Sequence, residues 1–265
     1  MTENFKKEDI IISEFLRSVG PWKEYIVIGG GYALIIYKLY FSDSSSINNP
    51  IGTRDIDSLI SRRIPEASIK DIAKHLQDAG FEKIYKDYDK PATEAYIKEI
   101  NQDEVEIEFL TDSNTRGDKQ KNVKISGVIA QPLQYLSLSI NKTLSFKTHS
   151  DEPGFVVSPG AWILHKGLTF KKRKDKPKSY KDLYGIWYVT TQLGDFSIKA
   201  LKEFYLLENE CPKWVKRFRD NLSDWIENAS PSDWSKLEMQ EPSGDLTRAR
   251  FKVAIEYLLK EQHNE

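Results

Sequence analysis

"YIVIGGGYALII", residues 25–36, places three consecutive glycines between an apolar, β-branched run and a second apolar run with helical spacing. The first run predicts a buried strand, and the second predicts a helix that packs on it. Glycines between them have two interpretations: the turn is sterically tight, or a ligand approaches the backbone closely. The residues that follow in the chain are needed to distinguish these two interpretations.

The first half of the chain continues with helix and strand patterns. Residues 6–18 predict an N-terminal helix, and "TRDIDSLIS", residues 53–61, alternates as a strand does. "PEASIKDIAKHLQDAGF", residues 65–81, predicts a helix that starts at a proline and ends just before a glycine. Three strand candidates follow within residues 81–111. This part of the chain therefore mixes both kinds of element.

The character of the sequence changes near residue 158. Residues 123–158 predict further strands, broken by Pro132 and by turns, whereas helical spacing dominates the chain from Pro159 onward. We therefore predict an α+β fold with a boundary at that point. A mixed sheet flanked by helices would occupy residues 1–158, and a C-terminal helical bundle would occupy residues 159–265.

Composition limits the classes of function. The 265 residues are 39% hydrophobic and 30% charged with a net charge of -1, so no strong overall field attracts nucleic acid or an anionic membrane. The single cysteine, Cys211, excludes an internal disulfide framework and favours a reducing, cytoplasmic setting. The longest apolar stretch, residues 25–37, is shorter than the roughly 20 residues that span a bilayer. We expect a cytoplasmic protein without a membrane partner.

Two pairs of acidic residues have the spacing of a strand face. Asp55 and Asp57 alternate with Ile56, and Glu106 and Glu108 repeat the pattern in "EVEIEFLT". An amphipathic sheet with one wet face explains any single pair. Two such pairs on adjacent strands would instead repel each other, and such a carboxylate cluster either raises its own pKa values or holds a cation. Hard carboxylate oxygens suit Mg²⁺, which keeps its other positions for water and phosphates.

The glycine turn, the D-x-D strand and a later acidic strand together resemble the DNA polymerase β-like nucleotidyltransferase superfamily. The resemblance implies a nucleotidyltransferase-type mixed sheet, with Mg²⁺ or Mn²⁺ held by Asp55, Asp57 and Glu108. It also implies that Gly29 and Gly30 let backbone N–H groups approach the nucleotide phosphates. Glu108 stands where the family has aspartate, and strand alternation leaves Glu106 open as the third acid. Arg54, next to the aspartate pair, is expected among the nucleotide contacts.

The helical half adds a second resemblance, to the AbiEii-like group of bacterial nucleotidyltransferases. "VVSPGAWILHKGLTFKKR" and "KPKSYKDLYGIWYV" resemble the lysine, the later basic residue and the Lys-Asp pair of that group. The resemblance implies that Lys166, Arg173 and Lys181 contact the nucleotide and that Asp182 is catalytic. Two alternatives stay open: the bases could be surface side chains, and Asp182 could cap its own helix together with Ser179.

The resulting functional hypothesis is transfer of a nucleoside monophosphate from an NTP to an acceptor hydroxyl on RNA, tRNA or protein. The AbiEii-like resemblance implies the toxin of a toxin–antitoxin or phage-defence pair, with a cognate antitoxin as partner. A catalytically inactive nucleotide-binding module and a small-molecule (antibiotic) nucleotidyltransferase are the alternatives. The basic residues 171–178 favour contact with phosphate or RNA over a small cationic acceptor, although such a stretch also fits a solvated loop.

Overall fold

The computed structural model of the chain describes residues 3–43, 53–66, 70–88, 91–113 and 122–260. Contacts between Cα atoms divide the chain into two compact units. The first comprises Met1–Tyr40 and Thr53–Val157, and the second comprises Phe41–Gly52 and Ser158–Glu265. The division into domains at residues 1–158 and 159–265 stays a prediction.

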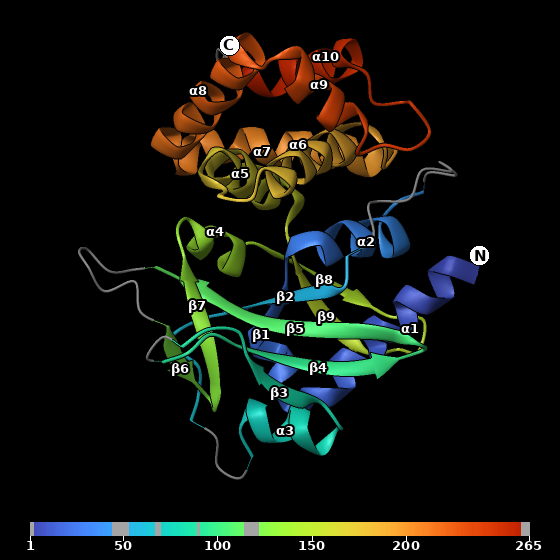
Figure 1. The fold of residues 1–265 in the computed structure, drawn as a ribbon, viewed down its shortest axis with the longest axis vertical. Coiled ribbons are helices and arrows are strands. Elements are labelled where there is room, and N and C mark those ends of the chain that lie inside the picture. The colour runs from blue at the N-terminus through green and yellow to red at the C-terminus, as the bar shows by residue number, and fades with distance from the viewer. Residues whose placement is uncertain (1–2, 44–52, 67–69, 89–90, 114–121, 261–265) are drawn as a thin grey trace. The chain divides into compact units, whose positions relative to one another are not determined.

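The first unit contains both helices and strands (Figure 1). Its helices are α1 (Glu3–Ser18), the 3-10 helix η1 (Gly20–Tyr25), α2 (Gly30–Tyr40), α3 (Ile72–Asp78) and α4 (Leu136–Asn141). Its strands are β1 (Ile26–Ile28), β2 (Asp55–Ile60), β3 (Glu82–Tyr85), β4 (Glu94–Ile100), β5 (Asp103–Asp112), β6 (Val123–Ile125), β7 (Val128–Leu133), β8 (Thr143–Lys147) and β9 (Pro153–Val157).

Within the described residues these strands form one sheet of nine strands. Seven of them follow the order β3-β4-β5-β2-β1-β9-β8, while β7 pairs with β5 and with β6. β2 runs parallel to β5 and antiparallel to β1, so the sheet is mixed. Helix α2 packs on β2 and β9, and α4 packs on β2 and β5. The predicted α+β fold with a mixed sheet and flanking helices is confirmed.

The alternating sequences of β2 and β5 give the sheet two different faces. Ile56 and Ile107 are directly opposite each other and are fully buried, as are Val105 and Phe109 on the same face of β5. Burying side chains of this size contributes about 1.5–3 kcal/mol each. The carboxylates between them must therefore point to the other face, which positions the candidate site.

Two expectations for the first unit are wrong in detail. The helix predicted from Pro65 begins only at Ile72, because Asp71 is its N-cap and accepts a hydrogen bond from Lys74 N at 2.8 Å. Residues 67–69 of that stretch lie outside the described residues. The predicted end is confirmed, since Gly80 follows the helix with φ +86°.

The stretch from 123 to 158 is not purely strands. It contains β6, β7, β8 and β9, but helix α4 separates β7 from β8. Asp112 accepts a hydrogen bond from Ser137 N at 2.8 Å, which satisfies a free N–H group at the start of α4. This side-chain contact comes from β5, so the local sequence gave no signal of it.

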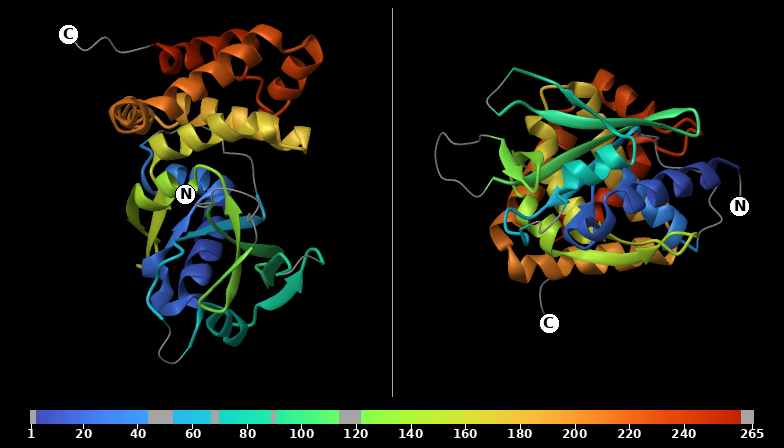
Figure 2. Two further views of the ribbon diagram at one scale, coloured as in Figure 1. Left: turned by 90° about the vertical axis from the view of Figure 1, so that its left-hand side faces the viewer. Right: turned by 90° about the horizontal axis from the view of Figure 1, so that it is seen from below.

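The second unit is helical, as predicted (Figures 1 and 2, yellow to red). Its helices are α5 (Pro159–Thr169), η2 (Phe170–Lys172), α6 (Lys176–Thr191), α7 (Asp195–Glu210), α8 (Pro212–Asn228), α9 (Pro231–Glu238) and α10 (Arg248–Leu259). Its core includes the fully buried aromatic side chains of Trp187, Phe204, Phe218 and Phe251. None of the helices in the described part of either unit is long and apolar enough to cross a membrane.

Candidate functional site

The three glycines lie against β2 and against Thr53, which comes two positions before that strand. A Cβ atom at Gly29 would stand 3.1 Å from the Leu59 side chain, and one at Gly31 would stand 2.7 Å from the Thr53 side chain. At Gly30 it would stand 1.8 Å from Asp57 Oδ2. The backbone continues this contact, since Gly29 N donates to Asp57 O at 2.8 Å. A side chain would press slightly on its neighbour at Gly29, and at Gly30 and Gly31 the neighbouring side chain would have to shift.

Gly30 has a second constraint besides space. Its φ is +56°, in the left-handed region that favours glycine, and it is the first residue of α2. The first N–H groups of this 11-residue helix have no acceptor within the helix, and its N-terminus carries partial positive charge. Asp57 therefore lies beside a helix start that also suits a phosphate.

The parallel pairing of β2 with β5 brings the two acidic pairs together in register. Asp55 is the Cα partner of Glu106, and Asp57 is the Cα partner of Glu108. Register partners point to the same face of a sheet, so the four carboxylates share the face opposite Ile56. This is the arrangement that the sequence predicts for a metal site.

Lys86, which directly follows β3, reaches the acidic pair on β5. Its Nζ forms ion pairs and hydrogen bonds with both Glu106 Oε1 and Glu108 Oε1. The route crosses β4 where Ala95, the partner of both Ile84 and Glu108, has only a methyl side chain. Burial alone would lower the pKa of Lys86, but its hydrogen bonds to the two glutamates outweigh burial and raise it.

Lys86 was not among the predicted site residues, although the sequence contains one sign of its position. Lys86 lies two positions after Ile84, so alternation places it on the same face as Ile84 and the residues in register with it. Only the order β3-β4-β5 reveals that this is the face of Glu108. That order depends on pairings between distant parts of the chain.

The donor set of the acidic face fits a hard divalent cation by chemistry, since it consists of carboxylates beside a helix N-terminus. One cation, the Lys86 ammonium, already bridges Glu106 and Glu108. As the side chains stand, no group of three or more His, Cys, Asp or Glu residues in the described part of the chain is arranged around a metal position. Metal binding would therefore require side-chain rotation, including release of a glutamate by Lys86.

Residues next to the acidic face add charges and hydrogen bonds to it. Arg54 directly precedes Asp55 and has an exposed side chain. Thr53 Oγ1 donates to Asp55 Oδ1 at 3.1 Å. Burial raises the pKa of Tyr32 in the first turn of α2, and the charges of Glu8 and Asp55 raise it further. The negative charge of Asp55 thus reaches the start of α2.

The helical unit brings together three of the predicted site residues. Lys166 Nζ lies 2.8 Å from Asp182 Oδ1, and Arg173 Nε donates to Asp182 Oδ2 at 2.8 Å. Burial alone would raise the pKa of Asp182, but the charges of Lys166 and Arg173 outweigh it and hold the pKa below its usual value. The Asp182 side chain is only 6% exposed, so its contacts are internal.

The capping alternative for Asp182 is wrong. Helix α6 begins at Lys176 with Asp175 as its N-cap, so Ser179 and Asp182 lie inside the helix. Pro177 in the first turn marks the true start. Lys181 points to solvent, and so do most residues from 171 to 178, while Lys171 pairs with Asp224.

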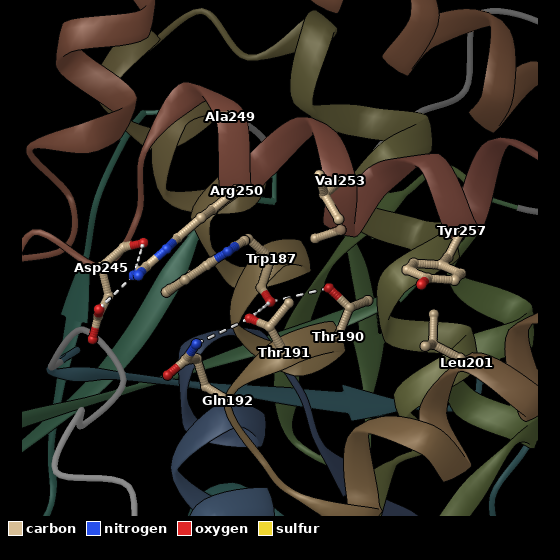
Figure 3. Close-up of a pocket in the computed structure, with 11 residues that line it drawn as sticks. Trp187, Thr190, Thr191, Gln192, Leu201, Asp245, Ala249, Arg250, Val253 and Tyr257 are labelled. Carbon is tan, nitrogen blue, oxygen red and sulfur yellow. Dashed lines mark hydrogen bonds and ion pairs between the residues drawn. The ribbon is translucent and has the colours of Figure 1, made fainter.

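A separate pocket of about 560 Å³ lies in the helical unit, lined largely by apolar side chains from α6, α7 and α10 (Figure 3). Its polar side chains bond to one another or to their own helix. Arg250 Nη1 donates to Asp245 Oδ1 at 2.6 Å, and Thr191 Oγ1 donates to Trp187 O at 2.7 Å. The lining therefore suits apolar groups, unlike the acidic face of the first unit.

Comparisons with known proteins found similar solved structures and one matching family model. A crystal structure of an antigenic nucleotidyltransferase-like protein from Paracoccidioides brasiliensis is similar, with a TM-score of 0.42 and 13% identity over 81% of this chain and 93% of that one. JHP933 from Helicobacter pylori has a TM-score of 0.39 and 11% identity over 97% and 94%. No curated protein matches. A family model described as nucleotidyltransferase matches residues 10–205, and the chain therefore belongs to the nucleotidyltransferase family of enzymes.

Proposed function

We propose that the protein transfers a nucleoside monophosphate from an NTP to an acceptor hydroxyl, with Mg²⁺ or Mn²⁺ held by Asp55, Asp57 and Glu108. One observation carries the proposal: the register of β2 and β5 makes Asp57 the neighbour of Glu108, and Gly30 lies against the same aspartate. The acid pairs and the helix N-terminus, which are distant in sequence, thus meet on one face of the first unit.

The phosphates of the NTP would lie at the start of α2. Gly29 and Gly30 have no side chains to obstruct them, and the helix N-terminus favours negative charge. Arg54, exposed beside Asp55, would neutralise further phosphate charge. These groups would orient the nucleotide before reaction.

A bound divalent ion would stabilise the entering and leaving oxygens of the in-line displacement. In that step the acceptor oxygen forms a bond to the α-phosphorus, and the bond from that phosphorus to pyrophosphate breaks. Glu108 would help to draw the proton from the acceptor hydroxyl. The side chains of the acidic face would thus both hold the ion and favour attack by the hydroxyl.

Glu108 is the better candidate for the third ligand than Glu106. It is the partner of Asp57, the aspartate beside Gly30, whereas Glu106 is the partner of Asp55. Of the two pairs, the one formed by Asp57 and Glu108 is therefore next to the N-terminus of α2. Glu106 would serve as a second anchor for Lys86.

In the helical unit we propose that Lys166, Arg173 and Lys181 bind phosphate and that Asp182 positions the first two. Asp182 touches both bases while nearly buried, which suits a positioning role better than direct contact with substrate. Arg173 keeps a third of its side chain exposed and so can reach a ligand. The basic stretch 171–178 supports RNA, including tRNA, over a protein acceptor.

The biological role as a toxin of a toxin–antitoxin or phage-defence pair rests on the AbiEii-like sequence resemblance. It predicts that induced expression arrests growth of the host cell, that Asp57→Asn abolishes the arrest, and that a cognate antitoxin relieves it. Growth that is unaffected by an active enzyme would contradict the toxin role and leave the proposed activity standing.

The activity itself is tested by incubating the protein with Mg²⁺, each α-labelled NTP in turn, and either total RNA or cell extract. Label in RNA supports the proposal and identifies the NTP and the acceptor. Label in protein or in a small metabolite supports transfer and changes the acceptor class. NTP binding without any transfer favours the inactive nucleotide-binding module.

A further inference from the structure

Lys86 occupies a distinctive position on the acidic face. It is the cation that bridges Glu106 and Glu108, and Glu108 is the residue proposed to hold metal together with Asp57. Its backbone is fixed as well, because Lys86 N donates to Thr93 O at 2.8 Å and continues the pairing of β3 with β4. The sheet therefore fixes the backbone position from which the Lys86 side chain reaches the two glutamates.

The ion pair and a divalent cation make incompatible demands on Glu108. An ammonium at one carboxylate oxygen places a positive charge beside Glu108, and that charge repels a second cation. The Lys86 side chain is 34% exposed, so it has room to rotate away when a stronger competitor arrives. Lys86 and metal would thus alternate at one position.

We propose that Lys86 is a built-in competitor for the divalent ion and that it sets the metal concentration at which the acidic face fills. Without metal, Lys86 neutralises part of the repulsion between the carboxylates and keeps the face intact. With metal, Lys86 leaves Glu108. This inference rests on the proposed metal-dependent function and adds a residue that controls its metal requirement.

The test measures Mn²⁺ binding directly, without nucleotide or turnover. Purified full-length protein is titrated with Mn²⁺, and the free ion is followed by electron paramagnetic resonance. Lys86→Met removes the competing charge, and we expect its Kd for Mn²⁺ to be about tenfold lower than that of the unmodified chain. Lys86→Arg keeps a positive charge at the glutamates, and its Kd should stay near the unmodified value.

Lys70→Met is the matched control. It makes the same change of charge in the same unit, but Lys70 pairs with Asp78, which retains Lys74 as a partner. Its Kd for Mn²⁺ should be unchanged. A similar decrease in Kd for Lys70→Met and Lys86→Met would indicate a general effect of net charge and would overturn the assignment.

The outcomes separate this inference from the proposed function. If the unmodified chain binds Mn²⁺ and Asp57→Asn does not, while Lys86→Met has an unchanged Kd, the competitor role fails and the metal site stands. If neither the unmodified chain nor Lys86→Met binds Mn²⁺, the metal-dependent function fails. Thermal unfolding without metal shows whether each variant is folded, so an unfolded variant is not mistaken for a nonbinding one.

Discussion

Gly30 and Asp57 lie so close together that a Cβ atom on Gly30 would stand 1.8 Å from Asp57 Oδ2. We predict that Gly30→Ala displaces the Asp57 carboxylate and abolishes Mn²⁺ binding, in addition to the roughly 1–3 kcal/mol cost of a left-handed alanine. Titration with Mn²⁺ and urea unfolding measure the two effects separately.

Gly80→Ala is the control for that prediction. Gly80 also has a positive φ, +86°, but a Cβ there would meet only Lys98 Cε at 3.9 Å. It should lose similar stability and keep Mn²⁺ binding. Equal Mn²⁺ affinity of Gly30→Ala and Gly80→Ala would show that the closeness of Gly30 to Asp57 has no role in metal binding.

Glutamine substitutions distinguish the two glutamates of β5. Glu108→Gln should lower the transfer rate by at least about a hundredfold, because it removes the proposed metal ligand that is paired with Asp57. Glu106→Gln removes the same charge at the residue paired with Asp55, and it should lower the transfer rate by less than about tenfold. Rates at saturating Mg²⁺ and NTP measure the difference. The reverse order would make Glu106 the third ligand.

The buried carboxylate of Asp182 should be important for the stability of the helical unit. Asp182→Asn leaves Lys166 and Arg173 without their shared partner, and we expect a loss of about 3 kcal/mol at pH 7. Asp220→Asn, an exposed change on α8, should stay within about 0.5 kcal/mol of the unmodified chain. Urea unfolding followed by tryptophan fluorescence measures both.

The advantage that Asp182 gives should depend on pH in a defined direction. Its pKa is held below the ordinary value, so the folded state favours the charged carboxylate. The stabilisation is therefore fully present above the unfolded pKa of about 4 and decreases as the pH falls through the lower folded pKa. The stability difference between the unmodified chain and Asp182→Asn should shrink from pH 7 to pH 3. A constant difference over that range would contradict the assigned pKa shift.

The basic stretch should contribute to RNA affinity through charge alone. Lys174→Ala with Lys178→Ala should weaken binding of single-stranded RNA and reduce the slope of log affinity against log salt by about 1.4. Lys213→Ala with Lys216→Ala removes two exposed lysines of α8 and serves as the control. Filter binding across a salt series provides the slopes. Identical slopes for the two double variants would exclude the stretch as an RNA contact.

The sequence predicted those features that depend on local pattern. Alternation around Ile56 and Ile107 was enough to place the acidic pairs on strand faces, and both isoleucines are fully buried. That Glu108 joins Asp55 and Asp57 in one site was an expectation that needed the family resemblance. The register that pairs Asp57 with Glu108 was not predicted, because register between distant strands is set by tertiary packing.

The features that the sequence did not predict involve side chains that meet across the fold. Lys86 reaches Glu108 across Ala95, and Thr53 limits the space at Gly31. Two helix starts were also predicted at the wrong residues, because another residue nearby begins the helix. Asp71 caps α3, which was expected to begin at Pro65, and Pro177 lies in the first turn of α6, ahead of the suspected cap at Ser179. Those two starts had signals in the sequence, whereas the contacts of Lys86 and Thr53 required the structure.

The most direct test of the proposed activity compares two aspartate variants in the transfer reaction. Label transfer from an α-labelled NTP is measured with and without Mg²⁺ for the unmodified chain, Asp57→Asn and Asp78→Asn. Asp78 lies on α3 and pairs with Lys70 and Lys74, so its substitution controls for the loss of a surface carboxylate. We predict Mg²⁺-dependent transfer by the unmodified chain and Asp78→Asn, and a loss of at least about a hundredfold in Asp57→Asn. Transfer that persists in Asp57→Asn, or that needs no divalent ion, would contradict the proposal.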